Sequence, residues 1–134
     1  MADLNNITFA CENPLPLSEF WAAALGYEPI ETPPEVVAEV EKAIERGELD
    51  PTGWAMLVHP EGVGPRLLFQ RRPKTPTESI PIHLDLKSED RHAEVERLRG
   101  LGATEVEERS QKIGPYEEFW TVMRDPEGNG FCVS

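Results

Sequence analysis

The feature that most constrains the fold of this chain is an internal repeat. A strand-like run at Ile7–Cys11 is followed by a proline-bounded break at Asn13–Pro16 and an amphipathic helical pattern at about 17–25, which ends in the pair Leu25-Gly26. The same order returns at Ile80–Leu86, where another strand-like run precedes a helical pattern that has Ser88 as its candidate N-cap and ends in Leu101-Gly102. The two Leu-Gly pairs lie 76 positions apart. A duplicated unit of strands and a helix is therefore the first hypothesis for the fold.

Both repeats continue with further strand-like runs after the helix. These runs lie at Trp54–His59 and Arg66–Arg71 in the first repeat, and at Thr104–Arg109, Glu117–Arg124 and Phe131–Val133 in the second. The first repeat also contains an extra helical pattern at about 34–47. We predict a single α+β domain over residues 1–134, built from two tandem βαβββ modules that form a cupped mixed sheet. The modules lie at about 5–72 and 80–134, and the extra helix is inserted in the first.

Charge and composition exclude several classes of partner. The chain has 25 acidic and 13 basic residues and a formal net charge of −12, which repels phosphate backbones and anionic lipid headgroups. No apolar run reaches the roughly 18 residues of a membrane-spanning helix, and the first residues do not resemble a signal peptide. We therefore expect a cytoplasmic protein that binds neither nucleic acid nor membranes.

Five segments in the same order resemble one known superfamily. They are FWAAALGY at 20–27, LLFQR at 67–71, HLDL at 83–86, EVERLRGLGA at 94–103 and DPEGNGFCV at 125–133. They are similar to the glyoxalase-like branch of the vicinal oxygen chelate superfamily, which includes glyoxalase I, extradiol dioxygenases and bleomycin-resistance proteins. The resemblance implies that the strands curl into a cup that holds a metal or ligand on its concave face. It also implies pairing of chains into a homodimer, but it does not choose one reaction.

The alternation of side chains along a strand assigns residues to the faces of the predicted sheet. In the HLDL segment, His83 and Asp85 share one face, and the two leucines share the other and pack under the helices. The same alternation places Thr8, Gln70 and Cys132 on the cup side. The resemblance implies that Thr8, Gln70, His83 and Cys132 stand at the four positions that hold the metal in the superfamily.

These four residues are a poor donor set for a divalent metal. Only His83 has the usual ligand identity. The resemblance also implies a glutamate on the last strand of each module, and both glutamates are missing here. Too little charge therefore converges to offset the dehydration of a metal ion. We therefore expect no cofactor and no authentic glyoxalase I activity. The alternative is a divalent metal, such as zinc, held by His83 and Cys132.

Two tryptophans lie on strand-like runs whose alternation is typical of either a pocket wall or ordinary core packing. Trp54 alternates with Met56 and Val58, and Trp120 alternates with Val122. Ligand pockets are mostly apolar with a few polar anchors, so both tryptophans are candidate walls for a flat ligand.

The polar candidates also have two interpretations each. His83 is a candidate general base with Asp85 as its partner, or it is a structural residue bonded to a neighbouring strand. Cys132 is a candidate nucleophile, or a small core residue. The acidic inserted helix is a lid or partner surface, or a solvated helix whose apolar face covers an open flank.

The sequence as a whole predicts a protein that binds a small organic molecule in an apolar or aromatic cup without the usual metal. Candidate catalytic residues are His83 and Asp85. Candidate ligand-binding residues are Thr8, Gln70, His83, Cys132, Trp54 and Trp120. The first alternative is a metal-dependent lyase or dioxygenase of the same superfamily. The second is a non-catalytic, drug-sequestering protein of the bleomycin-resistance type.

Overall fold

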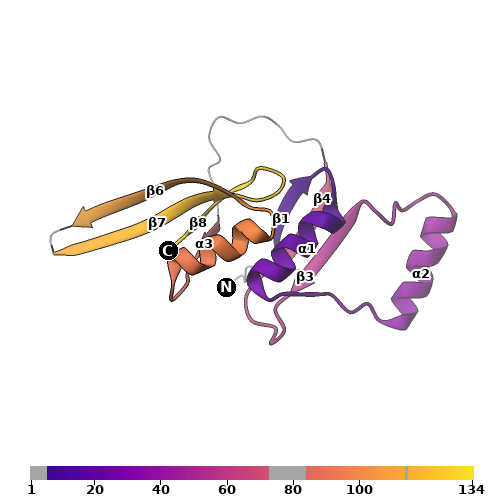
Figure 1. Cartoon of the computed structure of the whole chain (residues 1–134). Helices are drawn as coiled ribbons and strands as arrows, with labels where there is room; N and C mark the ends of the chain where they lie inside the picture. Colours follow the sequence, from indigo (N-terminus) through magenta and orange to yellow (C-terminus); the bar gives the residue numbers. More distant parts are fainter. Residues whose placement is uncertain (1–5, 73–83, 114) are drawn as a thin grey trace. The chain divides into compact units, whose positions relative to one another are not determined.

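The computed structural model describes residues 6–72, 84–113 and 115–134 (Figure 1). The chain divides into two compact units, Met1–Lys74 and Thr75–Ser134. Each unit contains one four-stranded sheet, in which one pair of strands is parallel and the others are antiparallel.

The first unit is a βαβββ module with one inserted helix. Its elements are β1 (Asn6–Cys11), α1 (Pro14–Leu25), β2 (Glu28–Pro29), α2 (Pro34–Glu45), β3 (Trp54–Val58) and β4 (Arg66–Arg71). The strands lie in the order β1-β4-β3-β2, and β1 runs parallel to β4. The short strand β2 completes the module, although its two residues were too few to be recognised in the sequence.

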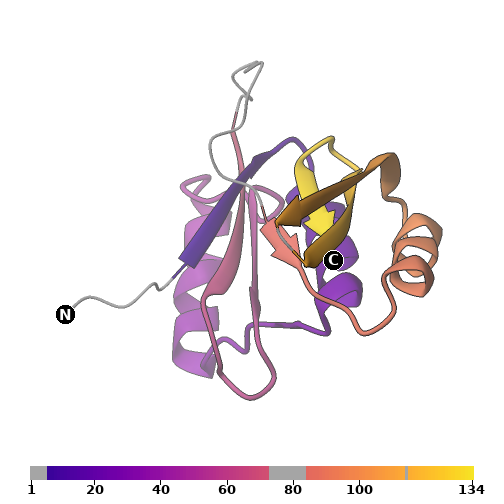
Figure 2. The same ribbon diagram turned by 90° about the vertical axis from the view of Figure 1, so that its left-hand side faces the viewer.

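The second unit is a βαβββ module without an insertion. Its elements are β5 (Leu84–Leu86), α3 (Arg91–Gly100), β6 (Thr104–Ile113), β7 (Tyr116–Arg124) and β8 (Gly130–Val133). The strands lie in the order β5-β8-β7-β6, and Figure 2 shows the salmon β5 beside the yellow β8. The predicted α+β fold of two tandem βαβββ modules is confirmed. How the two sheets form one cup stays a prediction.

The covered face of the first sheet packs against α1. Phe9 on β1 stacks on Phe69 of β4 with ring centroids 4.9 Å apart, and its ring lies 5.6 Å from that of Trp21 on α1. Phe69 and Trp21 are almost fully buried, as is Leu57 on β3. Apolar side chains removed from water in this way are the main source of stability for such a unit.

The covered face of the second sheet packs against α3 in the same manner. Val95 and Leu98 on the helix are buried, together with Met123 on β7 and Phe131 and Val133 on β8. These strand residues alternate with less buried neighbours, so each strand has one covered and one open face.

Helix α1 begins three residues before the predicted start at about residue 17. Pro14 and Pro16, which we interpreted as a break, lie in its first turn, where backbone N–H groups have no partner within the helix. The helix ends as predicted at Gly26, whose φ of 70° turns the chain so that the next N–H, that of Tyr27, also bonds the Ala22 carbonyl.

Helix α3 also begins differently from the prediction. Asp90, rather than Ser88, is its N-cap, and the Asp90 carboxylate accepts a 3.0 Å hydrogen bond from the Ala93 N–H. An aspartate at this position accepts a hydrogen bond from an N–H that has no partner within the helix. Its negative charge also interacts favourably with the positive end of the helix dipole.

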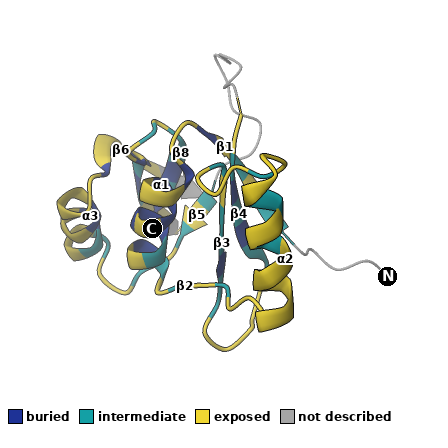
Figure 3. Cartoon of the chain, turned by 90° about the vertical axis from the view of Figure 1, so that its right-hand side faces the viewer, coloured by how far each residue is buried: buried dark blue, intermediate teal, exposed yellow. Residues whose placement is uncertain are grey.

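The inserted helix α2 contributes little to the core. None of its residues is buried, and Val36 and Val37 are 44% and 37% exposed (Figure 3). Val40 and Ile44 are only half-buried, so the predicted apolar face does not bury a flank of the unit. Within the described ranges, no helix is long and apolar enough to span a membrane.

Candidate ligand-binding site

The open face of the first sheet contains three of the predicted residues. Gln70 on β4 lies opposite Trp54 on β3 and Ala10 on β1. Thr8 lies on the same face of β1, opposite Leu68. All five side chains are exposed or half-buried, because α1 covers the other face of the sheet. The structure therefore brings Thr8, Gln70 and Trp54 together, as the alternation predicts.

The open face of the second sheet contains the other described candidates. Asp85 on β5 lies opposite Cys132 on β8, which lies opposite Val122 on β7. Asp85 is exposed, and its neighbours Leu84 and Leu86 are half-buried on the other face, as the alternation predicts. His83 lies outside the described residues, so its predicted place in the cup is not tested.

A depression of about 710 Å³ lies on this open face of the second sheet. Three of the predicted residues, Asp85, Trp120 and Cys132, line it. The other lining residues, which were not predicted from the sequence, are Lys87, Arg109, Glu118, Phe119 and Ser134. Continuing the alternation past Asp85 and Trp120 would have found Lys87 and Glu118, since both lie two residues away along the chain.

Arg109 could not be found in this way, because a β-bulge interrupts the strand that carries it. The register between β6 and β7 shifts between Glu105 and Glu107. Arg109 therefore lies opposite Trp120, whereas an unbroken register would place Glu108 there. The bulge exchanges an acidic side chain for a basic one beside the depression.

Some charged side chains around the depression form ion pairs within the protein, and others do not. The Arg109 guanidinium is paired with Glu107 on the same strand and donates to it through Nε at 2.7 Å. Lys87 and Glu118 form no ion pair with another residue of the described part of the chain. An ammonium and a carboxylate are thus available to a ligand.

The thiol of Cys132 is held in its neutral form. Partial burial raises the pKa of this thiol, and the nearby Asp85 carboxylate raises it further, while Arg109 lowers it. Thiolate is the nucleophilic and metal-binding form of cysteine, and it is disfavoured here at neutral pH. This environment makes Cys132 a small, weakly polar wall. The other cysteine, Cys11, is fully buried, and its thiol donates a 3.5 Å hydrogen bond to the Gln70 carbonyl.

The described donors do not fit a resident divalent metal. No three His, Cys, Asp or Glu side chains gather into a metal site within 6–72, 84–113 or 115–134. Thr8 and Gln70 offer only neutral oxygen donors, and the raised pKa of Cys132 opposes thiolate formation. The metal-dependent alternative stays a prediction that depends on His83.

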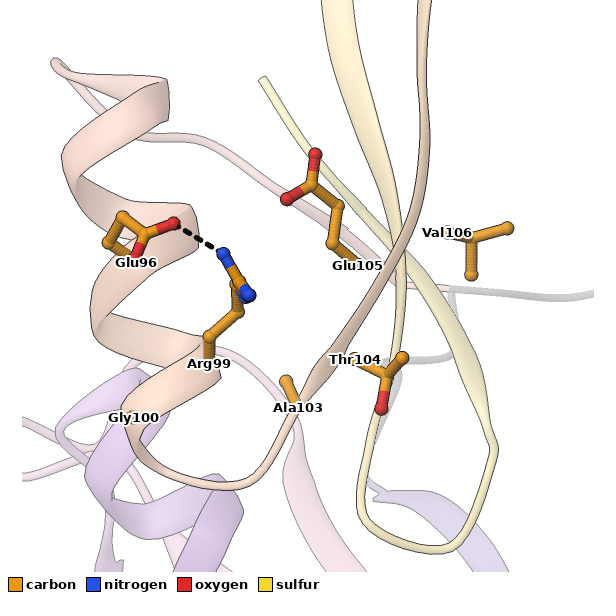
Figure 4. A pocket seen from close by; sticks show the side chains of 7 residues that line it. All are labelled: Glu96, Arg99, Gly100, Ala103, Thr104, Glu105 and Val106. Atoms are coloured by element: carbon orange, nitrogen blue, oxygen red, sulfur yellow. Dashed lines mark hydrogen bonds and ion pairs between the residues drawn. The ribbon is translucent and has the colours of Figure 1, made fainter.

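A second hollow, of about 750 Å³, lies where α3 ends and β6 begins (Figure 4). The Glu96 carboxylate in this hollow accepts a 2.7 Å hydrogen bond from Arg99. Glu105 points toward the helix, and Val106, at the bulge, points away from it (Figure 4). The only guanidinium that lines this hollow, that of Arg99, is already paired, and no aromatic side chain lines the hollow. It is therefore less suited to an organic ligand than the depression around Trp120.

Comparison with known proteins supports the fold over nearly the whole chain. The chain is similar to a glyoxalase/bleomycin resistance protein/dioxygenase family enzyme from Burkholderia phytofirmans, with a TM-score of 0.67, 18% identity, and 98% of this chain and 97% of the other covered. A glyoxalase family protein from Bacillus cereus gives a TM-score of 0.63 and 20% identity over 99% and 93% of the two chains. A search of the curated proteins found no match.

A third solved structure is a mutant fosfomycin resistance protein from Listeria monocytogenes in complex with Mn(II) and a dihydroxypropylphosphonic acid. Its TM-score is 0.67 at 13% identity, over 99% of this chain and 91% of the other. Identities this low establish a shared fold and do not transfer the metal or the ligand. The profile of the glyoxalase-like domain matches residues 6–134. Together with the two βαβββ modules, this match shows that the chain belongs to the glyoxalase-like domain family.

Proposed function

We propose that this protein binds a small organic molecule with an aromatic or apolar part in the depression on the open face of the second sheet. The observation that carries the proposal is the composition of that depression. It combines the aromatic rings of Phe119 and Trp120 with charged side chains, on a face that no helix of its unit covers. In small-molecule sites, aromatic and apolar walls supply affinity, and polar groups fix the orientation of the ligand.

The residues predicted from the sequence have distinct roles in this proposal. Trp120 is the flat wall on which a planar part of the ligand packs. Asp85 is a polar anchor, and the neutral thiol of Cys132 forms part of the floor between them. His83, if it faces the same way as Asp85, adds a second polar anchor. Thr8, Gln70 and Trp54 on the first sheet stay predicted contacts.

The neutral Cys132 thiol favours reversible binding over covalent catalysis. A nucleophilic cysteine needs neighbours that lower its pKa, and the two dominant influences on Cys132, burial and Asp85, raise it. The non-catalytic, ligand-sequestering alternative is therefore the second candidate function. Its signature is retention of the bound molecule without chemical change.

The experiment uses the three tryptophans of the chain as reporters. A set of small aromatic fragments is added to ¹⁵N-labelled protein, and the three indole N–H signals are followed by NMR. We expect the signal of Trp120 to shift with fragment concentration, whereas that of Trp21, which is 1% exposed, serves as an internal reference. The proposal would be overturned if no fragment shifts the indole signal of Trp120, or if only the signal of Trp54 shifts.

A further inference from the structure

We propose that the ligand of this depression is zwitterionic: it carries an anionic and a cationic group beside an aromatic or apolar part, as an aromatic amino acid does. This inference rests on the proposed function, because it names the class of molecule that the site on the second sheet takes. It follows from the two charges at the depression that the chain itself leaves available, Lys87 and Glu118.

The ammonium and the carboxylate reach the depression from different strands. Lys87 directly follows β5, two residues after Asp85 and on the same side of the chain. Glu118 lies on β7, two residues before Trp120. Since β8 separates β5 from β7 in the sheet, the two charges approach the indole from different directions. A ligand that lies on Trp120 can therefore present one group to each.

Both side chains are exposed and form no ion pair within the described ranges. Arg109 differs from Lys87, because its charge is already compensated by Glu107. Glu118 differs in the same way from Glu108, which accepts a 3.1 Å hydrogen bond from Arg91. Lys87 and Glu118 are thus the charges that a ligand can engage without first breaking an ion pair of the protein.

The balance of charges disfavours the simpler ionic ligands. A dianion, such as a phosphate monoester, would gain Lys87 but would face the carboxylates of Glu118 and Asp85, in a chain of net charge −12. A simple cation would be attracted by the same two carboxylates, but it would be repelled by Lys87 and would leave that ammonium without a partner. A zwitterion meets both charges with an opposite one, and charge-assisted hydrogen bonds are the stronger kind.

The test compares four probes that share one phenyl group, at neutral pH. They are L-phenylalanine, 3-phenylpropionate, 2-phenylethylamine and the neutral 2-phenylacetamide. Affinity is measured for each from the shift of the Trp120 indole signal during titration. We expect L-phenylalanine to bind about tenfold more tightly than either singly charged probe, since a hydrogen bond to a charged group contributes about 1.5 kcal/mol or more.

Two variants separate the contributions of the two charges. Lys87→Met should weaken L-phenylalanine and 3-phenylpropionate and leave 2-phenylethylamine unchanged or tighter. Glu118→Gln should weaken L-phenylalanine and 2-phenylethylamine and spare 3-phenylpropionate. The matched controls are Lys42→Met and Glu39→Gln, which remove an exposed ion pair on α2 of the first unit, and neither should change any affinity.

Failure of this inference can be distinguished from failure of the proposed function. If the neutral amide binds as tightly as L-phenylalanine, or if both charge variants leave all affinities unchanged, the zwitterionic ligand is overturned and the aromatic site stands. If neither these probes nor any aromatic fragment shifts the Trp120 signal, the proposed function falls together with the inference.

Discussion

The two sheets have similar covered faces and different open faces. On the first sheet, the row of residues through Gln70 contains Ala10 and Trp54 and carries no charge. On the second sheet, the row through Cys132 contains Asp85 and Val122. The next residues along its strands add further charges around Trp120. A repeated module thus keeps the apolar face that stabilises it, while its other face is free to change.

The register of the two sheets supports the repeat that the sequence indicates. Ala10 is the partner of Gln70 on the neighbouring parallel strand, and Asp85 is the partner of Cys132 in the same way. Ala10 and Asp85 lie 75 positions apart, which is the offset that aligns Thr8 with His83. The difference between an alanine and an aspartate at this equivalent position illustrates how the open faces have diverged.

The largest expected effect tests the similarity of the covered faces. Phe69 and Phe131 are 0% and 1% exposed on their respective sheets. Phe69→Ala and Phe131→Ala should each lower the free energy of unfolding by about 3–5 kcal/mol, because each leaves a cavity in a packed core. Denaturant unfolding measures this, with the exposed Thr8→Ala as control, expected within about 0.5 kcal/mol of the wild type. A large loss for only one of the two phenylalanines would break the comparison.

The next effect concerns a polar contact on the covered side of the second sheet. Arg91, whose side chain is 14% exposed, donates a 2.6 Å hydrogen bond to the hydroxyl of Thr121, which is 1% exposed. Arg91→Met should destabilise the protein by about 1–3 kcal/mol, because a buried acceptor loses its donor. Thermal unfolding checks this against Arg97→Met, which removes an exposed pair with Glu94. Equal losses for both variants would show that the Thr121 contact contributes nothing special.

A smaller effect concerns the reactivity of Cys132 on the open face of the second sheet. Because burial and Asp85 raise the pKa of its thiol, iodoacetamide should modify Cys132 at pH 8 more slowly than a free cysteine. Asp85→Asn should lower this pKa and speed the modification several-fold, and Arg109→Gln should slow it. Peptide mass spectrometry measures the rate, with the buried Cys11 as an unreactive reference. Faster modification than that of a free thiol would contradict the neutral wall that we infer.

The smallest effect concerns Asp50, in the loop before β3 of the first unit. Hydrogen bonds from the backbone N–H and hydroxyl of Thr52, with the nearby Arg71 guanidinium, hold the pKa of Asp50 below its usual value. A lowered pKa in the folded state means that this carboxylate favours folding above the unfolded-state pKa, and that the benefit is lost as the pH falls through the folded-state pKa. NMR titration of the carboxyl carbon should show Thr52→Ala moving the pKa upward. An unchanged Asp50 pKa in that variant would refute the contribution of the Thr52 hydroxyl.

The fold could be predicted because its signals are local and repeated. The alternation in HLDL places Asp85 on one face, and the glycine at position 26 ends a helix where a positive φ is needed. Two predicted helix starts were wrong. Prolines were interpreted as a break before α1, but they can also occupy the first turn of a helix. At α3, Asp90 competes with Ser88 for the N-cap position. Both errors lie at the ends of elements and do not affect the topology.

The candidate site was only partly predictable, because it depends on pairing between distant segments. Asp85, Trp120 and Cys132 follow from alternation alone. Arg109 does not, since the bulge at Glu105/Glu107 changes which residue lies opposite Trp120. Lys87 and Glu118 acquire importance only once neighbouring ion pairs are known, because a sequence does not show which charges are already compensated.

The measurement that tests the central claim most directly compares the two open faces through their tryptophans. Calorimetric titration of one aromatic ligand into the wild type, Trp120→Ala and Trp54→Ala gives three affinities under identical conditions. We predict that Trp120→Ala weakens binding by about 2 kcal/mol, roughly thirtyfold, and that Trp54→Ala has a clearly smaller effect. Unchanged affinity in Trp120→Ala, or a larger loss in Trp54→Ala, would contradict a ligand site on the second sheet.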